Sequence, residues 1–263
     1  MSVVAKAGRL AGKVAIITGQ LNISSQQQMS TESFLGGGSG FGAAIAKQFA
    51  NQGARIVVAD IDEDGGKRTV EHMSKDMKFH KANVTKERDW RTLIEATQDA
   101  FGGVDCLPTL EVTESDFDKC FDVNVKGIFF SISAVIPQLL EQKRGGSIIN
   151  VASIGATRPR AGLVWYNSSK GAVWNATKGL AAEFGPHGIR VNSVCPLLSR
   201  TGLFEMFSGV PDTQENRDKF LSNVPLGRLC DVTDVASACL FFASDESSFV
   251  TGINMEVDGG RAV

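Results

Sequence analysis

The sequence predicts an α/β fold: one doubly wound, parallel β-sheet with helices on both faces. Short apolar runs rich in β-branched residues alternate with stretches of helical length along the whole chain of 263 residues. This alternation is typical of buried parallel strands joined by crossover helices. No linker, repeat or low-complexity block interrupts it. We therefore expect residues 1–263 to form a single Rossmann-like domain.

Each element follows from a local pattern. The runs 55–60 (RIVVAD) and 189–196 (IRVNSVCP) predict strands, and 185–188 (GPHG) ends a helix. Thr113 begins a capping box, which predicts a helix N-terminus. Asn124 predicts a local break within a long helix, because its side chain competes for backbone hydrogen bonds. In order, the sequence predicts strands at 13–19, 55–60, 77–82, 146–151, 189–196 and 254–257, helices at 43–51, 64–75, 86–101, 113–142, 166–184 and 233–243, and a loop with short helical parts at 203–224.

Composition narrows the class of protein. The formal net charge is −2, the pI is about 6.0, and no block of Lys and Arg occurs, so a nucleic acid is not an expected partner. No apolar run approaches the roughly 20 residues of a membrane span. Residues 1–10 lack the apolar core of a signal peptide. We therefore expect a cytoplasmic protein without membrane contact.

The cysteines and histidines show no metal-binding pattern. The five cysteines are scattered without a Cys-x-x-Cys pair, and the three histidines have no ligand spacing. Reduced, buried thiols are therefore expected rather than disulfides, and no metal is expected.

The stretch 153–170 carries the candidate chemistry. Tyr166 is the only tyrosine, and Lys170 follows four residues later, so both side chains share one face of a helix. A neighbouring ammonium stabilises the phenolate, which makes the phenol a general acid/base near neutral pH. Ser153 follows an apolar run and is placed to hold a substrate oxygen. Taken alone, Tyr166 and Lys170 also fit an ordinary helix N-terminus with one amphipathic tyrosine and one solvated lysine. The surrounding motifs decide between this interpretation and the catalytic one.

Further motifs occur in a fixed order around this stretch. They are the glycine segment 37–42, Asp60, Asn124, Ser153, Tyr166, Lys170, Pro196, Thr201, 251–252 (TG) and 257–260 (VDGG). With this ordered set, the chain resembles the short-chain dehydrogenase/reductase family over residues 10–263. Each motif is weak evidence on its own, and the resemblance rests on the order in which the motifs occur.

The resemblance implies that a nicotinamide dinucleotide binds at the carboxyl ends of the strands. Asp60 would accept hydrogen bonds from the adenosine ribose and repel a 2′-phosphate, which favours NAD over NADP; it also fits an ordinary acid before a helix. Thr201 would meet the nicotinamide carboxamide, and Lys170 the nicotinamide ribose. The remaining residues implied to bind the cofactor are Gly19, Gly38, Ser39, Gly40, Phe41 and Gly42 at the pyrophosphate, and Asn83 and Val84 at the adenine.

The resemblance also implies a catalytic set. Tyr166 would exchange a proton with the substrate oxygen, Lys170 would favour the phenolate, and Ser153 would orient the substrate. Asn124 would hold a water that links Lys170 to solvent, although a satisfied core amide is its plainer interpretation.

The resemblance and the 197–224 segment together suggest the partners. The segment is rich in Phe and Met, so it would cover a small, uncharged substrate unless these side chains are ordinary core. The family resemblance further implies a homo-oligomer, either a tetramer or a dimer.

Two features depart from the family pattern. Residues 20–36, a polar Ser/Gln-rich segment, separate Gly19 from the other glycines, and no Asn-Asn-Ala-Gly strand follows Asp105. The segment can loop out and leave the phosphate turn intact, or it can displace that turn. The leading hypothesis is an NAD(H)-dependent oxidoreductase of secondary alcohols and ketones. The alternative is a catalytically impaired relative that acts as a binding or scaffold protein.

Overall fold

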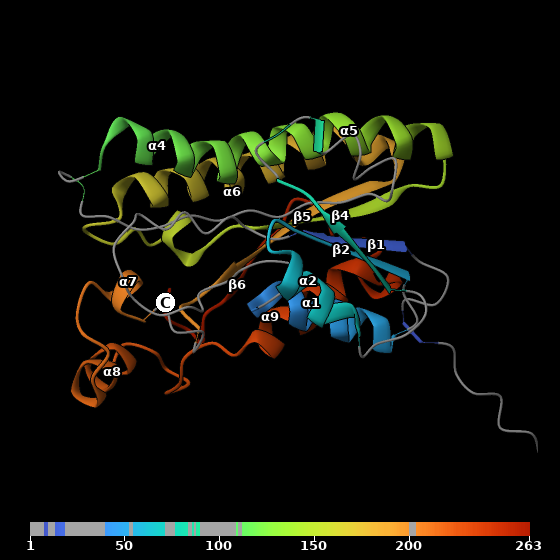
Figure 1. Ribbon diagram of the computed structural model, residues 1–263. Coiled ribbons are helices and arrows are strands. Elements are labelled where there is room, and N and C mark those ends of the chain that lie inside the picture. The colour runs from blue at the N-terminus through green and yellow to red at the C-terminus, as the bar shows by residue number, and fades with distance from the viewer. Residues whose placement is uncertain are drawn as a thin grey trace, which may run out of the picture.

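The computed structural model describes residues 8–9, 14–18, 40–52, 55–71, 77–83, 86, 88–89, 109, 112–199 and 204–263. Three layers are visible, with α4, α5 and α6 above the strands and α1, α2 and α9 below them (Figure 1). Every pairing between named strands is parallel. The predicted fold class is therefore confirmed.

The N-terminal strands form one three-stranded sheet in the order β1-β2-β3. Residues 56–59 of β2 are all buried, as expected for a parallel strand covered on both faces. The elements of this half are β1 (Val14–Thr18), α1 (Gly40–Asn51), β2 (Arg55–Asp60), α2 (Glu63–Glu71) and β3 (Met77–Lys81). The helix expected at 43–51 begins earlier, at Gly40, so the end of the glycine segment forms its first turn. Most of the helix expected at 86–101 lies outside the described residues.

The C-terminal strands form a second three-stranded sheet in the order β4-β5-β6. The strands are β4 (Gly146–Val151), β5 (Ile189–Pro196) and β6 (Asn254–Val257), and the helices between them are α6 (Val164–Phe184), α7 (Phe204–Ser208), α8 (Gln214–Leu221) and α9 (Val232–Ala243). Single helical turns occur at η2 (Ile154–Ala156), η3 (Gly185–His187) and η4 (Asp245–Ser247). The three strands and the α6 and α9 helices match the prediction, with boundaries within two residues.

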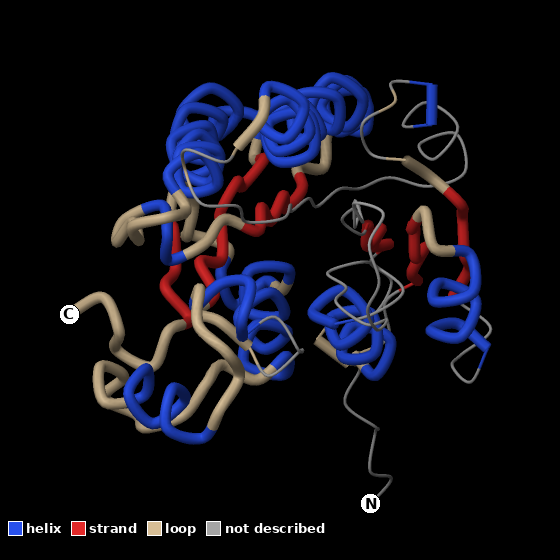
Figure 2. Tube along the Cα trace, turned by 60° about the vertical axis from the view of Figure 1, so that its left-hand side comes forward, coloured by secondary structure: helices blue, strands red, loops and turns tan. Residues whose placement is uncertain are grey.

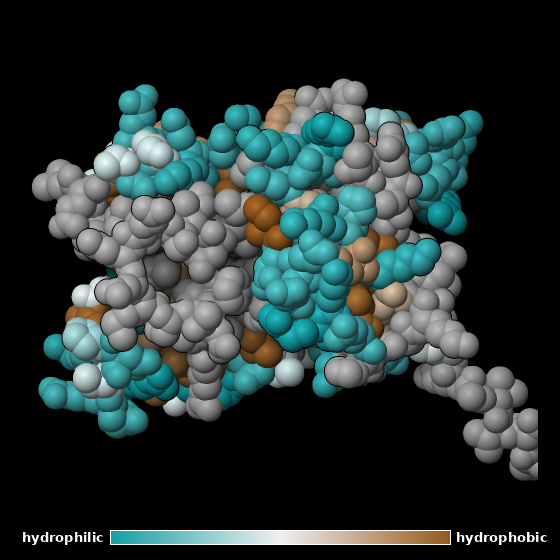
Figure 3. Space-filling model, viewed as in Figure 1, coloured by the Kyte–Doolittle hydropathy of each residue, from teal (hydrophilic) through white to brown (hydrophobic). Residues whose placement is uncertain are grey.

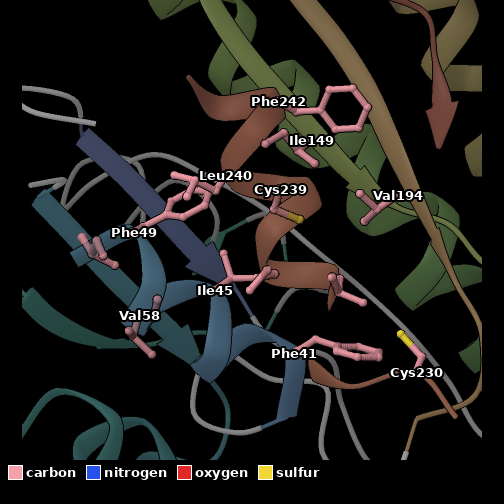
Figure 4. Close-up of a cluster of buried hydrophobic side chains, with 14 of the residues drawn as sticks. Phe41, Ile45, Phe49, Val58, Ile149, Val194, Cys230, Cys239, Leu240 and Phe242 are labelled. Atoms are coloured by element: carbon pink, nitrogen blue, oxygen red, sulfur yellow. The ribbon is translucent and has the colours of Figure 1, made fainter. Parts of the chain in front are cut away.

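The two sheets share one apolar core although no described strand joins β1 to β4. Figure 2 shows the strands in two separate groups with helices around both. Helix α1 packs against α9, and Phe41, Ile45 and Phe49 of α1 join Leu240 and Phe242 of α9 in a single buried cluster (Figure 4). The same cluster contains Val58 of the first sheet and Val194 of the second. The burial of these side chains therefore holds the two halves together.

A long helix crosses the outer face of the second sheet. It comprises α4 (Glu114–Phe121), the π-helical segment η1 (Asp122–Lys126) and α5 (Gly127–Gln142). Its N-terminus has the predicted capping box, in which Thr113 and Asp116 accept each other's backbone N–H. The π-helical segment confirms the predicted break at Asn124.

This long helix corrects one expectation from composition. Glu114–Gln142 is long and apolar enough to cross a membrane by length and composition alone, so the statement that no stretch approaches such a span was wrong. In the fold, its residues Val135 and Ile136 pack with Ile148 of β4 and Ala181 of α6 in a buried cluster. Packing against the sheet explains its apolar character.

Outside the core, the described surface in one view is largely hydrophilic. Figure 3 shows mostly polar residues over α2, with small apolar patches between them. Helix α2 itself carries five charged side chains in nine residues, and Glu63 forms ion pairs with Lys67 and Lys81. This face therefore needs no further cover by protein.

Candidate active site

A cavity of about 480 Å³ opens where β4 and β5 end. Its walls come from the segments after these strands and from helices α6, α7 and α8. The volume lies in the range of small-molecule sites, which in open α/β sheets lie outside the carboxyl ends of the strands. The position of the cavity therefore follows from the order of the strands.

Tyr166 and Lys170 both line this cavity from the first turns of α6. The turn before the helix needs Gly162, which has a φ of +83°. The Lys170 side chain is 2 % exposed, and its Nζ lies 5.9 Å from the centre of the Tyr166 ring. The same Nζ donates a hydrogen bond of 3.0 Å to the carbonyl of Val151, the last residue of β4. An ammonium is thus fixed beside the phenol, as the four-residue spacing predicted.

Ser153 reaches the same cavity from the other side, directly after β4. Its backbone is extended, and its Oγ accepts a 3.1 Å hydrogen bond from the N–H of Gly155. Gly155 is buried, and a Cβ at this position would clash with Oδ1 of Asn167. Asn167 in turn donates to the carbonyl of Arg160 at 3.0 Å. Glycine is therefore required for the turn that presents Ser153 to the cavity.

Asn124 is not part of the cavity lining and connects to Tyr166 through Ser169. Its Nδ2 donates to Oγ of Ser169 at 2.9 Å, and the Ser169 hydroxyl donates to the carbonyl of Tyr166 at 2.7 Å. Asn124 is 1 % exposed, and its Oδ1 accepts no hydrogen bond from the part of the chain that the structure describes. A buried carbonyl oxygen of this kind requires a partner, for which an ordered water is suited. The sequence analysis missed Ser169, whose only signal was its place between Tyr166 and Lys170.

An aromatic wall closes the cavity opposite the sheet. The ring of Phe207 meets the Tyr166 ring edge-on, with 5.4 Å between centroids. Phe204 packs in the same manner against Phe220 of α8, at 5.8 Å. Phe204 and Phe207 belong to the 197–224 segment that was expected to cover the substrate, and both line the cavity.

Four cationic side chains also line the cavity, and the sequence analysis did not bring them together. They are Arg158, Arg160, Lys219 and Arg261. Burial lowers the pKa of Arg160 from its usual value, and the nearby charge of Arg261 lowers the pKa further. The cavity is therefore apolar inside and positively charged around part of its wall.

The expected cofactor residues that the structure describes lie at the carboxyl edge of the first sheet. Asp60 ends β2 and is 5 % exposed, and its Oδ1 accepts the N–H of Asp62 at 2.9 Å. Gly40 begins α1 with a φ of +49°, and the following Phe41 lines the cavity from that helix N-terminus. Gly42 is buried within the first turn of the helix, and the N–H of Asn83 donates to Asp89 at 2.9 Å. Gly19, Gly38, Ser39, Val84 and Thr201 lie outside the described residues.

These groups fit a dinucleotide. A buried carboxylate at a strand end suits ribose hydroxyls, and the N–H groups that begin a helix of 12 residues suit a pyrophosphate. Phe41 connects this edge to the cavity that contains Tyr166.

The possible metal ligands and the cysteine thiols of the described residues offer no second reactive site. In the described part of the chain, no group of three or more His, Cys, Asp and Glu side chains is placed to hold a metal ion. Cys120, Cys195, Cys230 and Cys239 are buried free thiols, as predicted; Cys106 lies outside the described residues. Burial raises the pKa of Cys195 to about 11 and the pKa of Cys239 to about 12, so neither is a reactive thiolate at neutral pH.

Comparison with known proteins agrees with the fold. The family model described as enoyl-(acyl carrier protein) reductase matches residues 36–262. The chain is 39 % identical to a 4-formylbenzenesulfonate dehydrogenase of Comamonas testosteroni, over 87 % of this chain and 96 % of that protein. It is 35 % identical to a 2,5-dichloro-2,5-cyclohexadiene-1,4-diol dehydrogenase of Sphingobium indicum, over 98 % of this chain and 99 % of that protein.

A solved structure gives the same result. The 3-ketoacyl-(acyl-carrier-protein) reductase of Brucella melitensis, complexed with NADH, aligns with a TM-score of 0.83 and 34 % identity over 97 % of this chain and 100 % of that one. The chain belongs to the short-chain dehydrogenase/reductase family, whose members are nicotinamide-dependent. It is an oxidoreductase of that kind.

Proposed function

We propose that the protein catalyses NAD(H)-dependent interconversion of a secondary alcohol and a ketone, with Tyr166 as the general acid/base. The observation that carries this proposal is the convergence of Ser153, Tyr166 and the buried Lys170 on one cavity at the ends of β4 and β5. Two relatives support the substrate class, because their names contain a diol and a 3-ketoacyl group. The formyl group in the name of a third is an aldehyde, which is a carbonyl but not a ketone.

The chain's own residues supply the proton chemistry. Bound NADH or NAD provides or accepts the hydride. The Tyr166 hydroxyl gives a proton to the carbonyl oxygen during reduction and takes it back during oxidation. The ammonium of Lys170 favours the phenolate that remains after proton transfer. Ser153 Oγ donates a hydrogen bond to the same substrate oxygen and holds it beside the phenol.

Asn124 has a supporting role in this proposal. Its buried Oδ1 accepts no hydrogen bond from the described residues, so it is suited to hold a water beside the Lys170 end of α6. Such a water would pass a proton from solvent back to the site, so that Tyr166 is protonated again after each reduction. Asn124 thus acts through other groups and is a positioning residue.

We further propose that NAD is preferred over NADP because of Asp60. Its buried carboxylate lies at the end of β2, next to the exposed Ile61. A carboxylate there accepts hydrogen bonds from ribose hydroxyls and repels a 2′-phosphate. Its hydrogen bond to the Asp62 N–H fixes the side chain in position.

The two departures from the family pattern are compatible with this function. The family match starts at residue 36, which is the last residue of the 20–36 segment. On either side of that segment, β1 pairs in register with β2, and α1 packs in the core. We propose that 20–36 is an insertion relative to the family. We also propose that the family's Asn-Asn-Ala-Gly motif is lost, since this sequence occurs nowhere in the chain.

We propose a homo-oligomer as the working form. Phe129 of α5 is 62 % exposed, and Val164 and Trp165 at the start of α6 are 43 % and 40 % exposed. Exposed large apolar side chains on neighbouring helices are suited to an interface between copies. Light scattering of the parent and of Phe129→Asp should show a smaller species for the variant; equal masses would contradict this surface.

Tyr166→Phe tests the main proposal. The variant keeps the ring and its contact with Phe207 but loses the hydroxyl, so kcat for ketone reduction should fall by about 10²-fold or more. NADH binding, followed by nucleotide fluorescence, should be unchanged. Ser168→Ala is the matched control, because it removes an exposed hydroxyl of the same helix, which donates to the carbonyl of Val164. Retained turnover in Tyr166→Phe would remove Tyr166 from the mechanism.

A further inference from the structure

The wall of the cavity has an unbalanced charge. Beyond Lys170, four cationic side chains line it, and its lining contains no aspartate or glutamate from the part of the chain that the structure describes. The four come from three separate parts of the chain: the loop before α6 (Arg158 and Arg160), helix α8 (Lys219) and the C-terminal segment (Arg261). Folding therefore concentrates positive charge at one place.

Backbone oxygen atoms hold two of the arginines in position. Arg160 donates from Nη1 to the carbonyl of Phe207 at 2.6 Å and from Nη2 to the carbonyl of Ser208. Arg158 donates from Nη1 to the backbone oxygens of Arg261 and Val263, at 2.7 Å and 3.1 Å. A guanidinium has five N–H donors, so Arg160 keeps donors for a further acceptor. Both acceptors of Arg160 are neutral peptide carbonyls, so they fix its guanidinium without supplying a counter-charge.

Three acids close in sequence to these cations have other partners. Glu256 accepts the Thr157 hydroxyl at 2.7 Å, and Asp258 accepts the N–H groups of Gly260 and Ala262. Asp212 pairs with Arg217 on α8. Within the described residues, Arg160, Lys219 and Arg261 form no ion pair with an aspartate or glutamate. Like charges on one cavity wall repel one another, and an anionic ligand relieves this repulsion.

The geometry also indicates where the anion lies relative to the reacting carbon. The Phe207 ring contacts the Tyr166 ring, and the Phe207 carbonyl accepts the Arg160 guanidinium. Phe207 therefore contacts both the phenol and the guanidinium of Arg160. A substrate that fits this order has a carbonyl or hydroxyl at one end, an apolar ring in the middle and an anion at the other end.

We propose that the substrate is a ring compound with an anionic group, a carboxylate or a sulfonate, opposite its carbonyl or alcohol, and that Arg160, Arg261 and Lys219 bind this group. The inference rests on the proposed function, because it names the substrate class of the Tyr166 site. It replaces the expectation of an uncharged substrate, which considered only the apolar side chains of the 197–224 segment. Arg and Lys are the side chains suited to bind carboxylate and sulfonate oxygens.

The test compares two ketones of nearly equal shape, 4-acetylbenzoate and the neutral 4-acetylbenzamide. With NADH, the parent should reduce the anion with a kcat/KM about tenfold higher, as expected for one charge-assisted hydrogen bond. The KM for the anion should rise with added salt, while the KM for the amide should not. Equal kcat/KM values for the two ketones would overturn the inference.

Two variants assign the preference to the cations. The double variant Arg261→Gln/Lys219→Gln removes two of the charges. The side chains of Arg261 and Lys219 hold no other described element in place. The variant Arg160→Gln removes the third charge. Each should lower the preference for 4-acetylbenzoate, and the double variant should leave kcat for the amide within about twofold. Arg144→Gln, which changes an exposed arginine beside Gln142, is the control. An undiminished preference in both variants would show that other groups bind the anion.

A binding measurement separates this inference from the proposed function. Titration calorimetry of Tyr166→Phe with 4-acetylbenzoate and with 4-acetylbenzamide does not depend on turnover. If no ketone is reduced but the anion binds more tightly, and Arg261→Gln/Lys219→Gln removes the difference, the inference holds and the function fails. If ketones are reduced but neither binding nor kcat/KM depends on the anion, the function holds and the inference fails.

Discussion

Lys170 on α6 donates a 3.0 Å hydrogen bond to the carbonyl of Val151, the last residue of β4. This bond ties the helix that carries Tyr166 to the strand that leads to Ser153. It uses one of three ammonium donors, and the ammonium remains 5.9 Å from the centre of the Tyr166 ring. This hydrogen bond, together with the packing of α6 against η2 and β5, therefore fixes the phenol relative to the Ser153 hydroxyl.

Lys170→Met should reduce kcat/KM by about 10²-fold or more, because it removes the charge that favours the phenolate. It should also weaken NADH binding, if the ammonium meets the nicotinamide ribose. Steady-state kinetics and nucleotide fluorescence measure the two effects. Lys178→Met is the matched control on the same helix, where Lys178 lies 4.0 Å from the Trp174 ring centre, away from the cavity. Equal losses in both variants would indicate damage to α6 rather than to the site.

Asp60→Ala should relax the choice of cofactor. Removing the carboxylate eliminates its repulsion of a 2′-phosphate and its hydrogen bonds to the ribose, so the NADH/NADPH ratio of kcat/KM should fall by about tenfold or more. Asp64→Ala, in the first turn of α2, controls for the loss of an acid near this edge. An unchanged ratio in Asp60→Ala would show that this carboxylate does not determine the cofactor.

Two glycines of the second half should respond in opposite ways to alanine. At Gly155, the added methyl clashes with the Asn167 side chain, so Gly155→Ala should lower the free energy of unfolding by about 1–3 kcal/mol and raise KM through a shifted Ser153. At Gly179, in the exposed part of α6, no heavy atom lies within 4 Å of an added Cβ. Gly179→Ala should stabilise by about 0.5–1 kcal/mol. Urea denaturation measures both, and equal signs would contradict the packing at Gly155.

The α9 N-terminus should contribute stability that depends on pH. The hydrogen bond to Arg228 lowers the pKa of Asp234 below its ordinary value of 3.8, and the Asp231 N–H and the charge of Arg228 lower it further, against a smaller opposing effect of burial. A carboxylate with a lowered folded-state pKa stabilises the fold above its unfolded-state pKa, and this contribution is lost as the pH falls through the folded-state value. Its effect is therefore complete near pH 6 and disappears below about pH 3.8.

Asp234→Asn should lower the Tm by about 2–4 °C at pH 6, which corresponds to about 1 kcal/mol. The parent and the variant should converge as the pH falls to about 3. Thermal unfolding at a series of pH values tests this, with Asp118→Asn on the exposed side of α4 as the control. A difference in Tm that stays constant down to pH 3 would mean that the Asp234 charge is not involved.

Local sequence determined most elements and part of the site. Strands such as β5 are contiguous, β-branched runs, and the capping box of α4 and the break at Asn124 depend on residues close in the chain. The Tyr166–Lys170 pair was predictable because four residues span about one helical turn. Ser153 was predictable because it directly follows a strand.

Only the tertiary structure decided which distant segments meet. The packing of α1 against α9 unites two sheets that no described strand joins. The edge-on contact of Phe207 with Tyr166 depends on where α7 folds back. The cationic wall combines residues 158, 160, 219 and 261, which are far apart in sequence and have no periodic pattern. Such contacts depend on how the layers pack, because side-chain proximity over long sequence separations arises from burial of the shared core and not from any local preference of the backbone.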